Sequence, residues 1–146
     1  MKKSDIKAAA AILRRVNIAK VADKDIRKGL LNAFLPLAKE EKAFDEDMKT
    51  VQEKAFEGMD LNAHNELIGK IQKAKTAEEV SALEKQINPD IVDAIKSFND
   101  LYAEKLSAES EVTIEKMDSA AFLDAMGEQE TLTLAELEIL NNTILK

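Results

Sequence analysis

The chain has 146 residues, of which 45% are hydrophobic and 34% charged, with four Gly, two Pro and no Cys. This composition excludes collagen-like, disulfide-rich and low-complexity proteins, and a chain of this length is expected to form one soluble, helix-rich domain around one core. With no Cys, a single His and a formal net charge of −7, the sequence also excludes thiol nucleophiles and Cys/His zinc sites and argues against most His-based catalysis.

The first predicted element is a helix from Ser4, its N-cap, to about Val16. Its apolar residues recur every three or four positions, so they lie on one face of the helix. A short connection over residues 17–22 follows, and its Ile18 and Val21 are expected to point inward.

A long helix is predicted next, from Asp23 as the N-cap to about Glu57, with Gly58 at the C′ position. Pro36 lies inside it and either bends the helix or divides it in two; we favour a bend, because the apolar stripe keeps its phase across the proline. Glu41 breaks this stripe, which places it at the end of the packed seam or beside a base. The stripe has alternating spacings of four and three: Leu30, Phe34, Leu37, Glu41, Phe44, Met48, Val51 and Ala55.

Three further helices follow. The first is capped by Asp60 or Asn62, the second starts at a capping box over residues 76–79, and the third has Pro89 as its first residue and runs to about Leu106. The third is expected to pack antiparallel to the long helix and to form the spine of the fold with it. The inward residues of the three are Leu67, Ile68, Ile71, Ala74, Val80, Leu83, Ile87, Ile91, Ile95, Phe98, Tyr102 and Leu106.

The C-terminal part is predicted to hold one strand and two helices. Residues 111–116 alternate polar and apolar side chains, which is typical of a strand. A short helix from residues 118–119 to Gly127 follows, and a capping box over residues 133–136 introduces the last helix. The predicted fold is mostly α, a helical hairpin or bundle with a long bent helix and a C-terminal strand-plus-helix segment. Residues 1–146 form a single domain, with 98–146 as its C-terminal subsegment.

The chemistry-bearing residues match no catalytic or metal-binding motif. No Glu is followed by His three residues later, as di-metal helical bundles require, and the acids around Asp45 lack the glycine of a calcium loop. His64 is interpreted as a boundary residue with one satisfied nitrogen. We therefore expect a protein that is not an enzyme and has no catalytic residues, no metal and no cofactor.

Bases cluster near the N-terminus, where the end of the first helix and the start of the long helix are expected to converge. Such a positive corner suits a phosphate-containing small ligand or an acidic partner protein. The alternative is that the arginines complement the dipole of the first helix and the lysines only solubilise the surface. The candidate ligand- or anion-binding residues are Arg14, Arg15, Lys20, Lys24, Arg27 and Lys28.

Charge and hydropathy along the chain favour a cytoplasmic protein. Residues 1–30 hold nine bases and three acids, whereas residues 99–146 hold eleven acids and three bases. The acidic part repels a nucleic-acid duplex, which argues against a nucleic-acid partner. The apolar run after the start, residues 8–13, is too short for a secretory or membrane-spanning segment.

A set of residues in the C-terminal third forms a distinct layout: Phe98, Tyr102, Glu104, Leu106, the run 111–115, the run 132–137 and Leu140. With the long charged helix, these residues resemble a family of small tailed-phage proteins of unassigned function. The resemblance covers residues 23–57 and 98–140, and in that family an N-terminal helix, a long charged helix and an "acidic-Val-x-Ile" strand precede a closing helix that starts at a Leu-Thr step. It implies a phage or prophage origin, expression in a bacterial host cell, and a role in virion assembly or in dealing with the host.

Together these features predict a non-catalytic, phage-encoded helical binding protein with a virion-assembly or structural accessory role. A narrow apolar seam is best covered by a second helix, so the partner is another protein or a second copy, as a homo-oligomer. An alternative is an inhibitor of host antiviral defence that sequesters a nucleotide signal or blocks an effector through the basic corner. A third is an acidic mimic of nucleic acid formed by residues 99–146.

Overall fold

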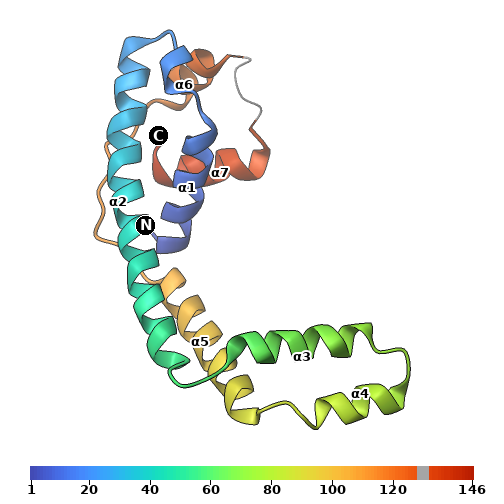
Figure 1. Cartoon of the computed structure of the whole chain (residues 1–146). Helices are drawn as coiled ribbons and strands as arrows, with labels where there is room; N and C mark the ends of the chain where they lie inside the picture. Colours follow the sequence, from blue (N-terminus) through green and yellow to red (C-terminus); the bar gives the residue numbers. More distant parts are fainter. Residues whose placement is uncertain (128–131) are drawn as a thin grey trace. The chain divides into compact units, whose positions relative to one another are not determined.

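The computed structural model describes residues 1–127 and 132–146. Over these residues the chain forms seven α-helices and one short 3-10 helix, and no strand (Figure 1). The mostly α fold predicted from the sequence is therefore confirmed. The helices are α1 (Lys3–Arg15), η1 (Ile18–Lys20), α2 (Lys24–Ala55), α3 (Leu61–Lys73), α4 (Ala77–Glu84), α5 (Pro89–Ser107), α6 (Ser119–Met126) and α7 (Leu134–Thr143).

The chain divides into two compact units. Unit 1 comprises Met1–Glu46 and Glu104–Lys146, and unit 2 comprises Asp47–Ala103. α2 and α5 each contribute residues to both units. That residues 1–146 form one domain stays a prediction.

Unit 1 holds a continuous core built around α1. The helix packs against α7, and its residues Ile6, Ala9 and Ala10 are at most 1% exposed. The core continues through the first half of α2 and the C-terminal helices, where the largest fully buried side chains are Leu30, Leu37, Phe122, Leu140 and Ile144.

Unit 2 has a thin core. Of its residues, all of which lie in the described part of the chain, only Met48, His64 and Ile91 are buried. α3 and α4 pack on each other as an antiparallel pair (Figure 1). In Figure 1 the last turns of α2 run in the opposite direction to α5 within unit 2, and the ring of Phe56, the residue that follows α2, lies 5.8 Å from that of Phe98, centroid to centroid. That α2 and α5 form the spine of the fold stays a prediction.

Local capping signals place most helix starts correctly. The side chains of Asp60, Thr76, Asp118 and Thr133 each accept a hydrogen bond from a main-chain N–H in the first turn of the following helix, and Thr133 forms the predicted capping box. The predicted cap at Ser4 is wrong, because α1 already begins at Lys3. The start of the chain is held instead by residues 108–110, since the main-chain N–H of Lys3 donates to the carbonyl oxygen of Ala108.

α2 passes through Pro36 as one helix. The tandem-helix alternative is therefore excluded. A proline removes one main-chain donor from the helix, so the carbonyl of Asn32 lacks its usual partner one turn ahead. The buried stripe holds α2 together across this position, because Ala33 and Leu37 on either side of the proline are at most 1% exposed.

The strand predicted at 111–116 is wrong: the segment is extended but belongs to no sheet within residues 1–127 and 132–146. A strand needs a neighbour along its length, and here only isolated bridges flank the segment, Lys2 with Glu109 and Met117 with Leu145. The alternation of exposed and half-buried residues is present, because Val112 and Ile114 pack against the helical core. The alternation therefore reflects side chains that pack against helices and not side chains of a sheet.

None of the helices in the described ranges combines the length and the apolar character that crossing a membrane requires.

Candidate functional site

The exposed side of α2 in unit 1 combines lysines with leucines. Along the helix, spacings of four and three residues place six side chains on one face, which we call the Lys–Leu face. All six residues are exposed. They are Lys24, Lys28, Leu31, Leu35, Lys39 and Lys42.

The two leucines are the unusual members of this face. Leu31 is 46% exposed and Leu35 57% exposed, although their neighbours Leu30 and Leu37 are fully buried. Single exposed leucines are common on protein surfaces. Two on successive turns of one helix, between two pairs of lysines, form a small apolar patch with a cationic border, and such a patch is typical of a binding surface.

The charge of the Lys–Leu face is not neutralised by the rest of the described chain. No carboxylate in residues 1–127 and 132–146 forms an ion pair with Lys24, Lys28 or Lys39. Lys42 lies 3.9 Å from a carboxylate oxygen of Glu46, at the outer limit of an ion pair, and both side chains are highly exposed. Surface pairs of this kind contribute little. The face therefore offers a partner four cations and two apolar side chains.

Two of the six predicted anion-binding bases already have internal carboxylate partners. Arg14 forms a hydrogen-bonded ion pair with Glu41 and lies 5.7 Å from the centre of the Phe34 ring. The hydrogen bond to Glu41 raises the pKa of Arg14 above its ordinary value. Glu41, the residue that breaks the apolar stripe of α2, thus lies beside a base, as one of the two sequence-based alternatives required.

Arg15 contacts the start of α7. Its guanidinium lies 2.8 Å from one carboxylate oxygen of Glu136, and the other oxygen accepts a hydrogen bond of 2.9 Å from the main-chain N–H of Thr133 in the capping box. The hydrogen bond from Arg15 is the main cause that lowers the pKa of Glu136. One carboxylate therefore both caps α7 and links it to the end of α1.

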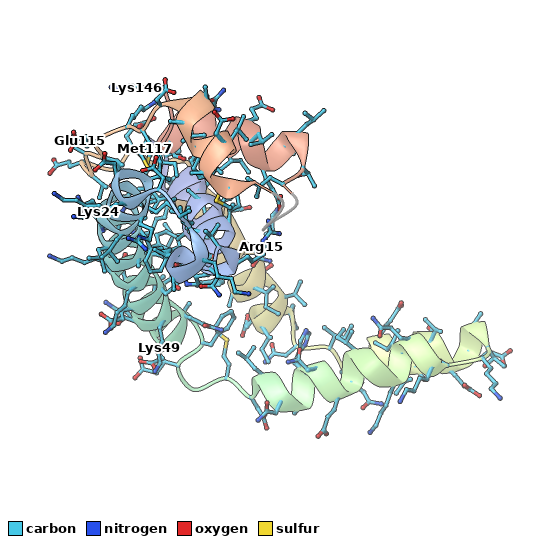
Figure 2. The ribbon with its side chains drawn as sticks, turned by 90° about the horizontal axis from the view of Figure 1, so that it is seen from above. Arg15, Lys24, Lys49, Glu115, Met117 and Lys146 are labelled. Carbon is cyan, nitrogen blue, oxygen red and sulfur yellow. The ribbon has the colours of Figure 1, made fainter. Side chains whose placement is uncertain are left out.

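The remaining predicted bases lie on or near α2. Lys20 is exposed in η1, and Arg27 is half-buried. Lys28 borders a hollow of about 290 Å³ where Asp25, Glu115 and Lys116 give mixed charge. Figure 2 places Arg15 and Lys24 on different sides of unit 1, so these two residues do not share one corner. Anion binding by the six bases stays a prediction.

Helices α6 and α7 of unit 1 also expose leucines, here accompanied by acids in place of lysines. Leu123 on α6 is 48% exposed, and Leu134 at the first position of α7 is 86% exposed. Asp124 and Glu138 are exposed on the same two helices. Between Lys116 and Lys146 the sequence has six acids and no base. We call Leu123, Asp124, Leu134 and Glu138 the α6–α7 surface.

Unit 2 contains a hollow of about 450 Å³ beside the single histidine. His64 is 8% exposed and lines it together with Asp60, Glu66 and Lys70. Its Nδ1 is buried and has no hydrogen-bond partner among the described residues. The expected satisfied nitrogen is therefore not Nδ1. In the described part of the chain, no three His, Asp or Glu side chains come together as potential metal ligands.

No protein-family model matches the chain, and no curated protein or solved structure is significantly similar to it. The site is thus interpreted from its own geometry. Sequence reasoning found Lys24 and Lys28 but missed the leucines beside them. The signal was present: Leu31 and Leu35 lie outside the buried stripe of the same helix and in phase with the lysines.

Proposed function

We propose that this protein is a non-catalytic helical binding protein that contacts a protein partner through the Lys–Leu face of α2. The observation that carries the proposal is the pair of exposed leucines, Leu31 and Leu35, between lysines without carboxylate partners. Covering the remaining apolar area contributes about 1 kcal/mol for each half-exposed leucine. The lysines favour an acidic partner and disfavour a basic one.

The biological setting of this proposal comes from the resemblance to small tailed-phage proteins. A phage-encoded protein that offers helical surface without chemistry suits virion assembly or a structural accessory role. A free phosphate ligand uses the lysines but not the leucines, whereas a protein partner uses both. The apolar pair is therefore the reason to prefer a protein partner.

The alternative function, an inhibitor of host defence that captures a nucleotide signal at the basic corner, has less support. It relies on Arg14 and Arg15, and each already binds an internal carboxylate, Glu41 and Glu136 respectively. A phosphate ligand has to displace these carboxylates before it gains either arginine.

The test compares three forms of the protein in co-purification from bacteria that carry the phage genes. The double variant Leu31→Asp/Leu35→Asp places two negative charges in the centre of the Lys–Leu face. The matched control, Gln52→Asp/Gln72→Asp, adds the same charge at exposed positions of α2 and α3 outside the face. We expect a partner that is retained by the unchanged protein and by the control and is lost from the face variant. Equal retention by all three forms, or no partner at all, contradicts the proposal.

A further inference from the structure

The Lys–Leu face is not complementary to itself. If two copies of α2 pack antiparallel with Leu31 and Leu35 at the centre, Lys24 of one copy lies opposite Lys42 of the other, and Lys28 lies opposite Lys39. A parallel arrangement places each lysine opposite its own counterpart. Like charges held together at an interface oppose association. A symmetric dimer through this face is therefore disfavoured.

The chain carries a complementary surface elsewhere in unit 1. The α6–α7 surface has two exposed leucines, Leu123 and Leu134, and two exposed acids, Asp124 and Glu138. Leu134 is 86% exposed, the most exposed large hydrophobic residue of the described chain. Both surfaces thus expose two leucines, and the charges beside the leucines are of opposite sign.

We propose that copies of this chain associate head to tail, with the Lys–Leu face of one copy on the α6–α7 surface of a second copy. This inference rests on the proposed function and names the partner as a second copy. The two surfaces lie on different elements of unit 1, and the first turn of α7 projects on the side of α1 away from α2 (Figure 1). One molecule therefore contacts two others at the same time.

Association through two different surfaces is heterologous, so each added copy presents a new free surface. Such contacts form a ring where the rotation between copies closes and an open filament where it does not. This separates the proposal from a symmetric dimer, which stops at two copies. It also makes the two halves of the interface separable by mutation.

The test uses one variant for each surface. Leu31→Asp/Leu35→Asp removes the Lys–Leu face and leaves the α6–α7 surface intact; Leu134→Lys/Glu138→Lys does the reverse. We expect the unchanged protein to form oligomers larger than two copies in analytical ultracentrifugation, with an affinity that falls as salt is added. Each variant alone is expected to be monomeric, with association at least about 10-fold weaker than that of the unchanged protein. An equimolar mixture of the two is expected to stop at a one-to-one heterodimer, because each molecule then has one working surface.

Two control variants carry the same change in net charge as the two surface variants, but at positions outside the proposed contacts. Gln52→Asp/Gln72→Asp matches the charge of the first variant at exposed positions away from the Lys–Leu face, and Glu111→Lys/Thr113→Lys matches that of the second at exposed positions before α6. Both controls should form oligomers like the unchanged protein. Circular dichroism checks that all variants keep their helix content, and the mixing experiment itself shows that each monomeric variant still has its other surface.

Four results overturn the inference. A symmetric dimer of the unchanged protein, or a mixture that stays monomeric, excludes head-to-tail contact. Monomeric unchanged protein whose Lys–Leu face still retains a foreign acidic protein also overturns it, but leaves the proposed function standing. Conversely, oligomers that form through other surfaces, together with equal partner retention by all three forms in the co-purification, contradict both proposals.

Discussion

At the scale of single residues, the strongest contacts of the N-terminal bases are made within the chain. Arg15 and Glu136 are far apart in the sequence and meet because α1 packs on α7. The sequence gives the charge of Arg15 but not its partner, since any exposed carboxylate of the acidic C-terminal part is an equal candidate. The caps at Asp60, Thr76, Asp118 and Thr133 were predictable because donor and acceptor lie within three residues of each other.

The Arg15–Glu136 pair predicts a pH dependence of stability. Because the folded-state pKa of Glu136 lies below its ordinary value of 4.5, the charged carboxylate stabilises the fold above that pH, and this contribution is lost as the pH falls through the folded-state pKa. Glu136→Gln should therefore lower the urea midpoint at neutral pH and lower it less under acid conditions. Equilibrium urea unfolding over a series of pH values measures this difference.

Glu115→Gln is the matched control, because Glu115 is an exposed carboxylate of unit 1, outside the proposed contact surfaces, without an ion pair among the described residues. Its midpoint should follow that of the unchanged protein at every pH. A constant difference between Glu136→Gln and the unchanged protein from neutral to acid pH contradicts the assignment.

At the scale of helices, periodicity identified α2 and its buried stripe, but not the close approach of α2 to the segment before α6. A Cβ added at Gly29 meets the Sδ of Met117 at 2.6 Å and its Cγ at 2.9 Å. Met117 is only 9% exposed, so its side chain has little open space into which it can shift. A contact between residues so far apart in the chain leaves no trace in a local pattern.

This contact predicts opposite effects of one substitution at two helical glycines. Gly69→Ala in α3 meets nothing within 4 Å and should gain up to about 1 kcal/mol from the higher helix propensity of alanine. Gly29→Ala gains the same propensity but forces Met117 out of place, and overpacking of this kind costs about 1–3 kcal/mol. We expect a net loss of about 1 kcal/mol for Gly29→Ala, measured by urea unfolding. A gain in stability at both positions shows that Met117 adapts freely.

The strand predicted at residues 111–116 was wrong for a similar reason, because a local pattern does not show which distant residues a segment contacts. Alternation over residues 111–116 was correct as a pattern of exposure, because Val112 and Ile114 are half-buried and their neighbours are exposed. A pattern of period two reports only which side chains point inward. Whether the inward side chains meet a sheet or a set of helices depends on the rest of the chain.

At the scale of the whole molecule, the core is unevenly distributed. Of the residues of unit 2, all described, only two hydrophobic side chains are buried, Met48 and Ile91, whereas unit 1 contains the complete connected core around α1. The sequence did not reveal this difference, because α3 and α4 have apolar stripes like those of the other helices. A stripe shows which face is apolar, and only the structure shows how far that face is covered.

The thin core of unit 2 predicts a difference in local stability. Main-chain amides in α3 and α4 should exchange with deuterium much faster than those in α1 and α7, because opening of a helix with few buried contacts needs little free energy. Hydrogen–deuterium exchange with mass spectrometry measures this for each helix. Equal protection of α1 and α3 contradicts the prediction.

Pro36 has one more effect on the α2 helix. The oxygen that it deprives of a donor belongs to Asn32, an exposed residue at the edge of the leucine patch. An apolar ligand such as a detergent tail, bound over this oxygen, excludes water without donating a hydrogen bond, at a cost of about 1–3 kcal/mol. A polypeptide that brings an amide, hydroxyl or ammonium group to the oxygen avoids that penalty, so the proline favours proteins over lipids as occupants.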